Sequence, residues 1–528
     1  MREIIKPGRS NILAANGMVA TSNPLSSQEG LSILKKGGNA VDAAIAASAV
    51  QAVVEPGSTG IGGDCFAIIS MNGCKPVAVN GSGIAPKNAN LKYFTNNKIK
   101  KITLDSPHSV TIPGCIHAWH SMHQKYGKLD FEELFRSAIS FSENGFPVHE
   151  IESITWQENK NKLSKNSHTK KIFLPNNRAP KFGEIFKNPA LSNSLKIISK
   201  KGARGFYEGE LAKDMVSTLT ALGGTHTMED FLNQKTEFSK TINNKYKDYI
   251  LHQCPLNGPG IIVLIMMSIL EKFNFKNINP NSFERYHIQS EVTKVCYELK
   301  ETKLGDPKYN NINYKEILSD HFINNLFDRI KFDEVIYSEK SIVTSHPETI
   351  YLTAVDNNFN SVSFINSICH AFGSGITSSN SGILFQNRGV NFRLEKNHPN
   401  SINSNKRPLH TIIPGLLTDN NNNTLFSFGV MGGQYQPIGQ SHILQNIFDF
   451  NMTIQEAIDF PRAFCLNNKL ILEKTISKEI FEKLTKLGHK TLYSNVPIGG
   501  GQGIYIDRLK GVLIGGSDSR KDGLAIGY

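Results

Sequence analysis

The stretch Ala40–Val54, AVDAAIAASAVQAVV, constrains the fold of this chain most strongly. Its apolar side chains fall on almost every face of a helix, with Asn39 placed to cap the start and Pro56 to stop the end. A helix that is apolar all round has no face to offer to water, so it is normally buried between layers. Apolar strands such as Cys65–Ser70 lie between helical stretches, which predicts an α/β protein built in layers.

The two halves of the chain differ in pattern. A hairpin is expected from Cys65–Ser70 and Pro76–Asn80 with a turn at Asn72-Gly73, and residues 110–240 read as mainly helical. After residue 349 the pattern is rich in strands, beginning with Ile350–Val355, a polar turn and Ser361–Asn366. A chain of 528 residues allows either two lobes or one large interwoven unit.

Composition excludes several classes of protein. Apolar residues make up 39% of the chain and charged residues 20%, as in an ordinary globular protein. The net charge of +12 is spread out with no basic run interleaved with aromatic residues, so we expect no nucleic-acid partner. The seven cysteines are widely spaced without a CxxC pair, and the N-terminus has no apolar signal region. Because Ala40–Val54 is also too short and too polar to span a bilayer, we expect a cytoplasmic protein without a membrane partner.

Common catalytic motifs are missing from the sequence. No GxSxG, GxxxxGK[ST] or HExxH occurs, and the glycine runs at 60–63 and 499–503 do not complete GxGxxG before a helix. The histidines are scattered, so we predict no metal site. A Ser–His–Asp hydrolase stays open, because the order of its residues is not set by sequence.

Three segments contain groups that could take part in catalysis or substrate binding. Thr349 heads the strand Ile350–Val355, where cutting the Glu348–Thr349 bond would give its hydroxyl an adjacent α-amine as general base. Gly432-Gly433 lies between an apolar strand and a helix, where backbone N–H groups can face an oxyanion. Lys406–Thr411, KRPLHT, is a cationic loop with a hydroxyl group. Taken singly, Thr349 is better explained as an ordinary strand residue, Gly432-Gly433 as a tight turn and Lys406–Thr411 as a loop.

Together these segments resemble the gamma-glutamyltransferase family of N-terminal-nucleophile hydrolases. The resemblance runs almost end to end and keeps the family's order. Its segments are GGNAVDAAIAASAVQAVVEPGSTGIGGDCF (37–66), SVTIPG (109–114), ENGFPV (143–148), ETIYLTAVDNNFNSVSFIN (348–366), FGSGITSSNSGILFQNRG (372–389), KRPLHTIIP (406–414), GVMGGQYQPIGQ (429–440), EAIDFPR (456–462) and GGSDSRKDGLAIGY (515–528).

The resemblance implies a four-layer αββα sandwich and a precursor that cleaves itself between Glu348 and Thr349. The large subunit would be residues 1–348 and the small subunit 349–528, interlocked as one unit, in an assembly of one or two such pairs. Thr349 would attack an amide and form an acyl-enzyme, with Gly432 and Gly433 stabilising the oxyanion and Ser367 supplying a second hydroxyl. The family needs no metal or organic cofactor.

The departures from the family lie in the substrate pocket. Glutathione-acting relatives place an arginine at Ser82, an acidic residue at Asn391, an asparagine at Cys369 and paired serines at His410-Thr411. A serine does not replace a bidentate arginine–carboxylate contact. The nearby cations that could hold a different carboxylate are Arg388, Arg393, Lys406 and Arg407.

The sequence is therefore similar to the family's signal-less, glutathione-hydrolase-like branch and to its acylase and oxamate-amidohydrolase relatives. We expect a hydrolase rather than a transpeptidase, acting on a gamma-glutamyl or other small anionic amide. One alternative is an oxamate- or glutaryl-type amidohydrolase without gamma-glutamyl transfer. A second, from another class, is an unprocessed and inactive binding protein.

Overall fold

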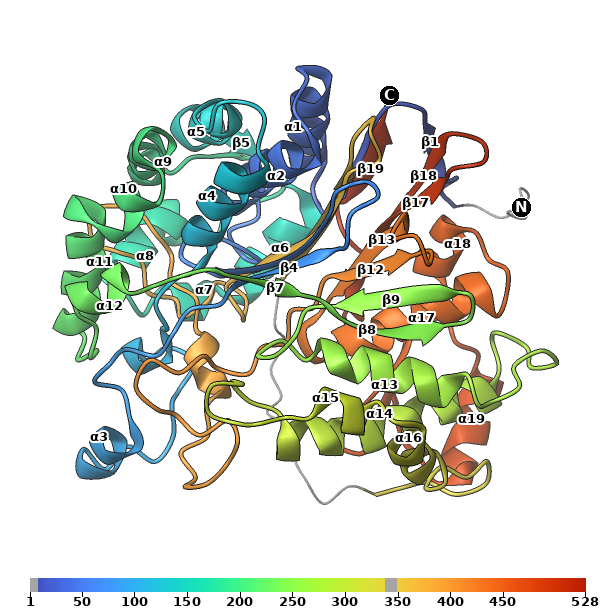
Figure 1. Ribbon diagram of the computed structural model, residues 1–528. Helices are drawn as coiled ribbons and strands as arrows, with labels where there is room; N and C mark the ends of the chain where they lie inside the picture. Colours follow the sequence, from blue (N-terminus) through green and yellow to red (C-terminus); the bar gives the residue numbers. More distant parts are fainter. Residues whose placement is uncertain (1–7, 338–348) are drawn as a thin grey trace.

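Two sheets stacked face to face form the centre of the molecule in the computed structural model, which describes residues 8–337 and 349–528 (Figure 1). Neighbouring strands are antiparallel throughout both sheets. The first sheet has the order β19 (Leu524–Gly527), β2 (Met18–Thr21), β10 (Ile350–Val355), β11 (Ser361–Ser367), β3 (Asp64–Ser70), β4 (Val77–Gly81) and β7 (Glu237–Lys240). The second has the order β1 (Ile12–Ala14), β18 (Val512–Ser517), β17 (Gly500–Asp507), β13 (Thr424–Met431), β12 (Gly415–Thr418), β9 (Tyr249–Gln253) and β8 (Ile242–Tyr246).

Helices cover the outer face of each sheet. On the first sheet lie α1 (Pro24–Lys35), α2 (Ala40–Val54) and α4 (Cys115–Tyr126), and α5 (Arg136–Asn144) packs on α2. The remaining helices of this side are α6 (Glu150–Glu158), α7 (Lys160–Leu163), α8 (Ser167–Phe173), α9 (Pro189–Lys201), α10 (Ala203–Tyr207), α11 (Gly209–Ala221) and α12 (Met228–Leu232). On the second lie α13 (Gly260–Leu270), α17 (Gln436–Phe448) and α18 (Ile454–Asp459), with α14 (Phe283–Lys303), α15 (Tyr314–Ile317), α16 (Asp320–Phe327) and α19 (Lys478–Leu487) outside them. The layers confirm the predicted αββα sandwich.

Smaller elements stand apart from the sandwich. They are α3 (Leu91–Asn96), the pair β5 (Phe146–Pro147) with β6 (Ile185–Phe186), and a sheet of β14 (Ala463–Leu466), β15 (Lys469–Leu472) and β16 (Lys490–Tyr493). Among residues 8–337 and 349–528, no helix combines the length and apolarity needed to cross a bilayer.

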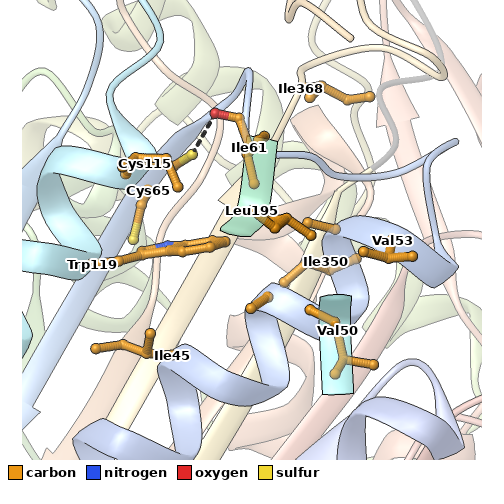
Figure 2. Close-up of a cluster of buried hydrophobic side chains, with 14 of the residues drawn as sticks. Ile45, Val50, Val53, Ile61, Cys65, Cys115, Trp119, Leu195, Ile350 and Ile368 are labelled. Atoms are coloured by element: carbon orange, nitrogen blue, oxygen red, sulfur yellow. Dashed lines mark hydrogen bonds between the residues drawn. The ribbon is translucent and has the colours of Figure 1, made fainter. Parts of the chain in front are cut away.

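The predicted central helix is α2, and every one of its residues is buried. Asn39 begins it with a capping box, its side chain accepting from the N–H of Asp42 while the Asp42 carboxylate accepts from the N–H of Asn39. Figure 2 shows Val50 and Val53 of α2 in one apolar cluster with Ile350, the first residue of β10. The helix layer is therefore packed directly against the start of the strand that follows Thr349.

The predicted hairpins are also confirmed. Strands β10 and β11 are joined by the turn at 356–360, where the Asp356 N–H donates to the Asn360 carbonyl at 3.1 Å. Strands β3 and β4 pair as expected from the turn at 72–73. Both sheets take strands from the two sides of residue 348, so the chain is one interwoven unit rather than two lobes.

Candidate active site

Thr349 lies at the head of β10 and is 1% exposed. The β10–β11 register pairs Ile350 with Asn366, which sets Thr349 opposite Ser367. The two hydroxyl oxygens lie 3.0 Å apart. Ser367 is itself paired with Asp64 on β3, so a three-strand ladder holds the two hydroxyl groups in place.

The alternation of β10 directs Thr349 toward the second sheet. Ile350 packs in the cluster around α2, whereas Tyr351 and Thr353 face β13: a Cβ on Gly429 would come 2.3 Å from the Tyr351 ring, and Thr353 Oγ1 lies 2.7 Å from Ser427 Oγ. Continuing this two-residue step places Thr349 at the level of Met431.

The glycine pair follows Met431 immediately. Gly432 and Gly433 have φ of +113° and +56°, backbone conformations that strongly favour glycine. A side chain on Gly432 would also come within 2.7 Å of the Gly499 backbone. The positive φ angles favour glycine at both positions, where Gly432 links β13 to the helical turn that Gly433 begins.

Arg388 is the charged group nearest to the hydroxyl pair in the hydrogen-bond network. Its side chain is fully buried; Nη2 donates to Ser367 Oγ and Nη1 to Thr411 Oγ1, each at 3.0 Å. Its Nε has no partner among the described residues. A single hydroxyl therefore separates a guanidinium from Thr349.

Asp64 is the buried carboxylate that faces this charge. Its Oδ1 accepts hydrogen bonds from the N–H of Gly83 at 2.8 Å and of Gly114 at 3.2 Å. Burial raises the pKa of Asp64 to about 7, although the charge of Arg388 acts in the opposite direction. Asp64 is therefore partly protonated near neutral pH.

His410 lies 3.6 Å from Asp64 Oδ2 through its Nε2 and is fully buried. Burial, together with the charges of Arg388 and Arg407, holds the pKa of His410 well below its usual value. The imidazole is therefore neutral, and its contact with Asp64 is not an ion pair. Its Nε2 lies 2.8 Å from Ser82 Oγ.

Ser82 was expected from the family resemblance to replace an arginine, and other protein groups surround its side chain. Besides His410, the Asn257 amide donates to Ser82 Oγ at 2.9 Å. The Arg407 side chain donates to Asn80 Oδ1 at 2.7 Å and to the Lys235 carbonyl at 2.9 Å. The guanidinium of Arg407 is thus occupied by the protein itself.

A hollow opens beside Thr411. It gathers three of the predicted substrate-binding residues, Asn391, His410 and Thr411. Glu301 in its wall accepts from Arg393 Nη2 at 2.6 Å and lies 3.1 Å from Lys300 Nζ. Burial opposes ionisation of Glu301, but Lys300 and Arg393 outweigh it and lower its pKa. The complete lining is Lys300, Glu301, Asn391, Arg393, His398, Asn400, Leu409, His410, Thr411 and Gln434.

A protein-family model described as gamma-glutamyltranspeptidase matches residues 26–528. The chain belongs to this family. Its curated relatives include the glutathione hydrolase-like YwrD proenzyme of Bacillus subtilis (strain 168), 34% identical over 98% of this chain and 99% of the relative. The oxamate amidohydrolase proenzyme of Klebsiella pneumoniae is 28% identical over 98% of this chain and 100% of the relative.

Solved structures agree with this assignment. The cephalosporin acylase from Bacillus halodurans superposes with a TM-score of 0.94 at 33% identity, covering 99% of this chain and 98% of that one. The family unites hydrolases and transpeptidases of the N-terminal-nucleophile type, and several relatives bear the name proenzyme. The chain is thus a gamma-glutamyltranspeptidase family member related to amide-cleaving enzymes with different substrates.

The remaining predicted residues occupy two other positions. Cys369 is 2% exposed with φ of +80°, and its N–H donates to Ser367 Oγ at 3.0 Å. Burial raises the pKa of its thiol, but Arg388 and His370 outweigh burial, and the net shift is downward. Cys369 therefore lies beside the hydroxyl pair, outside the lining of the hollow. Glu348 falls outside the described residues.

Sequence reasoning missed Lys300, Glu301 and Asp64 as parts of the site. The first two lie on α14, far along the chain from the family segments, and no local motif marks them. Asp64 stood inside the matched segment 37–66, where its position at the start of a strand was the one available signal. Their roles emerge only when β3, β10 and α14 are brought together.

Proposed function

We propose that this family member is a self-processing amide hydrolase that acts through an acyl-enzyme on Thr349. The observation that carries the proposal is the chain of contacts from Thr349 to Ser367 to Arg388, buried at a strand end. A nucleophile, a hydroxyl that orients it and a cation for an anionic substrate thus occur in one row.

The reaction starts with scission of the Glu348–Thr349 bond, which frees the α-amine of Thr349. That amine takes the proton of Thr349 Oγ as the oxygen attacks the amide carbonyl. Backbone N–H groups of Gly432 and Gly433 stabilise the oxyanion. The leaving amine then departs with the proton, and water cleaves the ester to release the acid and restore Thr349. Ser367 Oγ holds the attacking rotamer of Thr349.

The position of Arg388 favours substrates with a short acyl group. Two hydrogen bonds of 3.0 Å link its Nη2 to Thr349 Oγ1 through Ser367, so the two atoms lie no more than about 6 Å apart. A carboxylate held by this guanidinium at about 2.8 Å therefore lies only a few bonds from the scissile carbonyl. In a gamma-glutamyl group the α-carboxylate is three carbons away from that carbonyl.

The surroundings of Ser82 support the same preference. Where glutathione-acting relatives have their carboxylate-binding arginine, His410 and Asn257 fill the space with neutral groups. Thr411 lines the hollow and also accepts from Arg388, so a carboxylate entering the hollow can replace its hydroxyl on Nη1. We expect short dicarboxylic monoamides, of the oxamate type, to be hydrolysed faster than gamma-glutamyl amides, with hydrolysis preferred over transfer.

Intact mass measurement and a denaturing gel test the proposal. The wild-type chain of 58.5 kDa should convert into fragments of residues 1–348 and 349–528. Thr349→Ala should remain whole, whereas Thr349→Ser, which keeps the hydroxyl, should still be cleaved. A wild-type chain that stays intact after long incubation would overturn the proposal in favour of an unprocessed binding protein.

A substrate panel then ranks the acyl groups. Oxamate, glutaryl amides, a gamma-glutamyl anilide and glutathione are offered to the processed protein, with amine acceptors present or absent. Faster turnover of the gamma-glutamyl substrates would refute the short-acyl preference while leaving Thr349 as nucleophile. The cytoplasmic location and the assembly of one or two large–small pairs also belong to this proposal, and fractionation and light scattering test them.

A further inference from the structure

Three buried side chains with metal-binding atoms meet far from Thr349 in the chain. His287 and Glu291 lie one turn apart on α14, and His489 lies between α19 and β16. Each is at most 4% exposed, and one ligand atom from each lies within 4.8 Å of the other two. The chemistry proposed for Thr349 uses none of them. The scattered histidines predicted no metal site, but folding brings these two together.

The distances between the three atoms fit a metal ion. His287 Nδ1 lies 2.9 Å from His489 Nε2, and Glu291 Oε1 lies 4.0 Å and 3.8 Å from these nitrogens. A point equidistant from three atoms at these separations is roughly 2.1 Å from each of them, within the range of Zn²⁺ bonds to imidazole and carboxylate. Tetrahedral spacing, about 3.4 Å between ligand atoms, would need the His287–His489 contact to open and the two contacts of Glu291 to close, each by about 0.5 Å.

Neighbouring groups already orient the ligands. His287 Nε2 lies 2.7 Å from the Lys331 carbonyl, which can only accept, so Nε2 carries the proton and Nδ1 presents its lone pair to the cluster. A backbone carbonyl on the far nitrogen is a common outer partner of a zinc-bound histidine. Glu291 Oε2 accepts from the N–H of Ile336 at 2.8 Å, so Oε1 is the carboxylate oxygen that faces the two imidazoles.

We propose that His287, Glu291 and His489 form a Zn²⁺ site. Two imidazoles and one carboxylate are a donor set that zinc accepts with a fourth position open to water. The first two ligands precede residue 348 in the chain and the third follows it. The ion would thus fasten together segments from the two sides of residue 348.

Lys294 sets the strength of this site. Its Nζ lies 2.6 Å from Glu291 Oε1, so its positive charge stands close to the position of the ion. Repulsion between the ammonium and a dication weakens binding. Replacing Lys294 by the uncharged Met should therefore tighten Zn²⁺ binding, whereas a simple salt bridge between Lys294 and Glu291 predicts no gain.

The test measures metal bound by the full-length protein. After equilibration with Zn²⁺ and removal of free ion, elemental analysis should find about one Zn²⁺ per chain, and Co²⁺ should give the visible bands of a tetrahedral site. His287→Gln and His489→Gln should each lower affinity by about tenfold or more, and Lys294→Met should raise it. His252→Gln, which alters a buried histidine bound to Thr241 and Thr418, should bind as the wild type does.

Thermal unfolding adds a readout that needs no variant. Zn²⁺ should raise the unfolding temperature of the wild-type chain, because an ion bound to the folded state alone stabilises it. A wild-type chain that takes up no Zn²⁺ or Co²⁺ would overturn the proposal. So would equal binding by the wild type and both His287→Gln and His489→Gln.

Discussion

Asp64 offers a direct test of the electrostatics beside the nucleophile. Both of its hydrogen bonds, from the N–H groups of Gly83 and Gly114, are made by Oδ1. Its Oδ2 has no hydrogen-bond partner among the described residues. Asp64→Asn keeps an oxygen for both donors and removes only the ionisable group, so its effect reports the charge.

The magnitude follows from the two pKa values of Asp64. Burial raises its pKa from 3.8 to about 7 in the folded protein. Between these values the folded protein holds a proton that the unfolded chain has lost. The stabilisation is therefore complete below the unfolded pKa and is lost as pH rises through the folded one. The whole loss is about 4 kcal/mol, of which about 3 kcal/mol falls between about pH 5 and about pH 8.

Urea unfolding at these two pH values measures the effect. Thr349→Ala serves as the parent, because it should remain one chain, and is compared with the same protein carrying Asp64→Asn. The free energy of unfolding of the parent should fall by about 3 kcal/mol more than that of the variant as pH rises. Parallel profiles for the two proteins would refute the assignment of a raised pKa to Asp64.

Two further replacements test the packing of the sheets and the substrate cation. Gly429→Ala puts a Cβ 2.3 Å from the Tyr351 ring, so it should lower the free energy of unfolding by about 1–3 kcal/mol in urea; a loss below about 0.5 kcal/mol would contradict the close stacking. Arg388→Met should lower kcat/KM for anionic amides at least about tenfold more than for neutral amides of equal size. Equal losses for both amides would show that Arg388 only positions Ser367.

Local pattern was enough to predict an α/β protein and its buried faces, the family resemblance supplied the four-layer order, and neither predicted the electrostatics. The periodicity of Ala40–Val54 and of Ile350–Val355 reports which faces are buried, and both elements form as expected. Whether a charge is buried beside the nucleophile depends on contacts between distant segments, as with Arg388 and Ser367. The sequence shows Arg388 as one cation among several; packing alone distinguishes it from Arg407, whose guanidinium the protein occupies.

The same distinction applies to the histidines. His287 and His489 are far apart in the chain and carry no motif spacing, and only the packing of α14 against the segment after α19 brings them to 2.9 Å. Glu301 and Lys300 enter the hollow from the same helix. A long helix without a strongly apolar face gives no sign in its sequence of which polar residues will be enclosed.

The order of strands in the first sheet has a consequence for whether unfolding is reversible. From β19 to β2 and on to β10, neighbouring strands come alternately from after and before residue 348. A cut before Thr349 would leave these strands interleaved in the folded protein, but they would then belong to two separate chains. The processed protein would then be unable to refold once unfolded, because its interleaved strands were assembled while the chain was still intact. Heating and cooling the processed protein should show hysteresis, while uncut Thr349→Ala retraces its path.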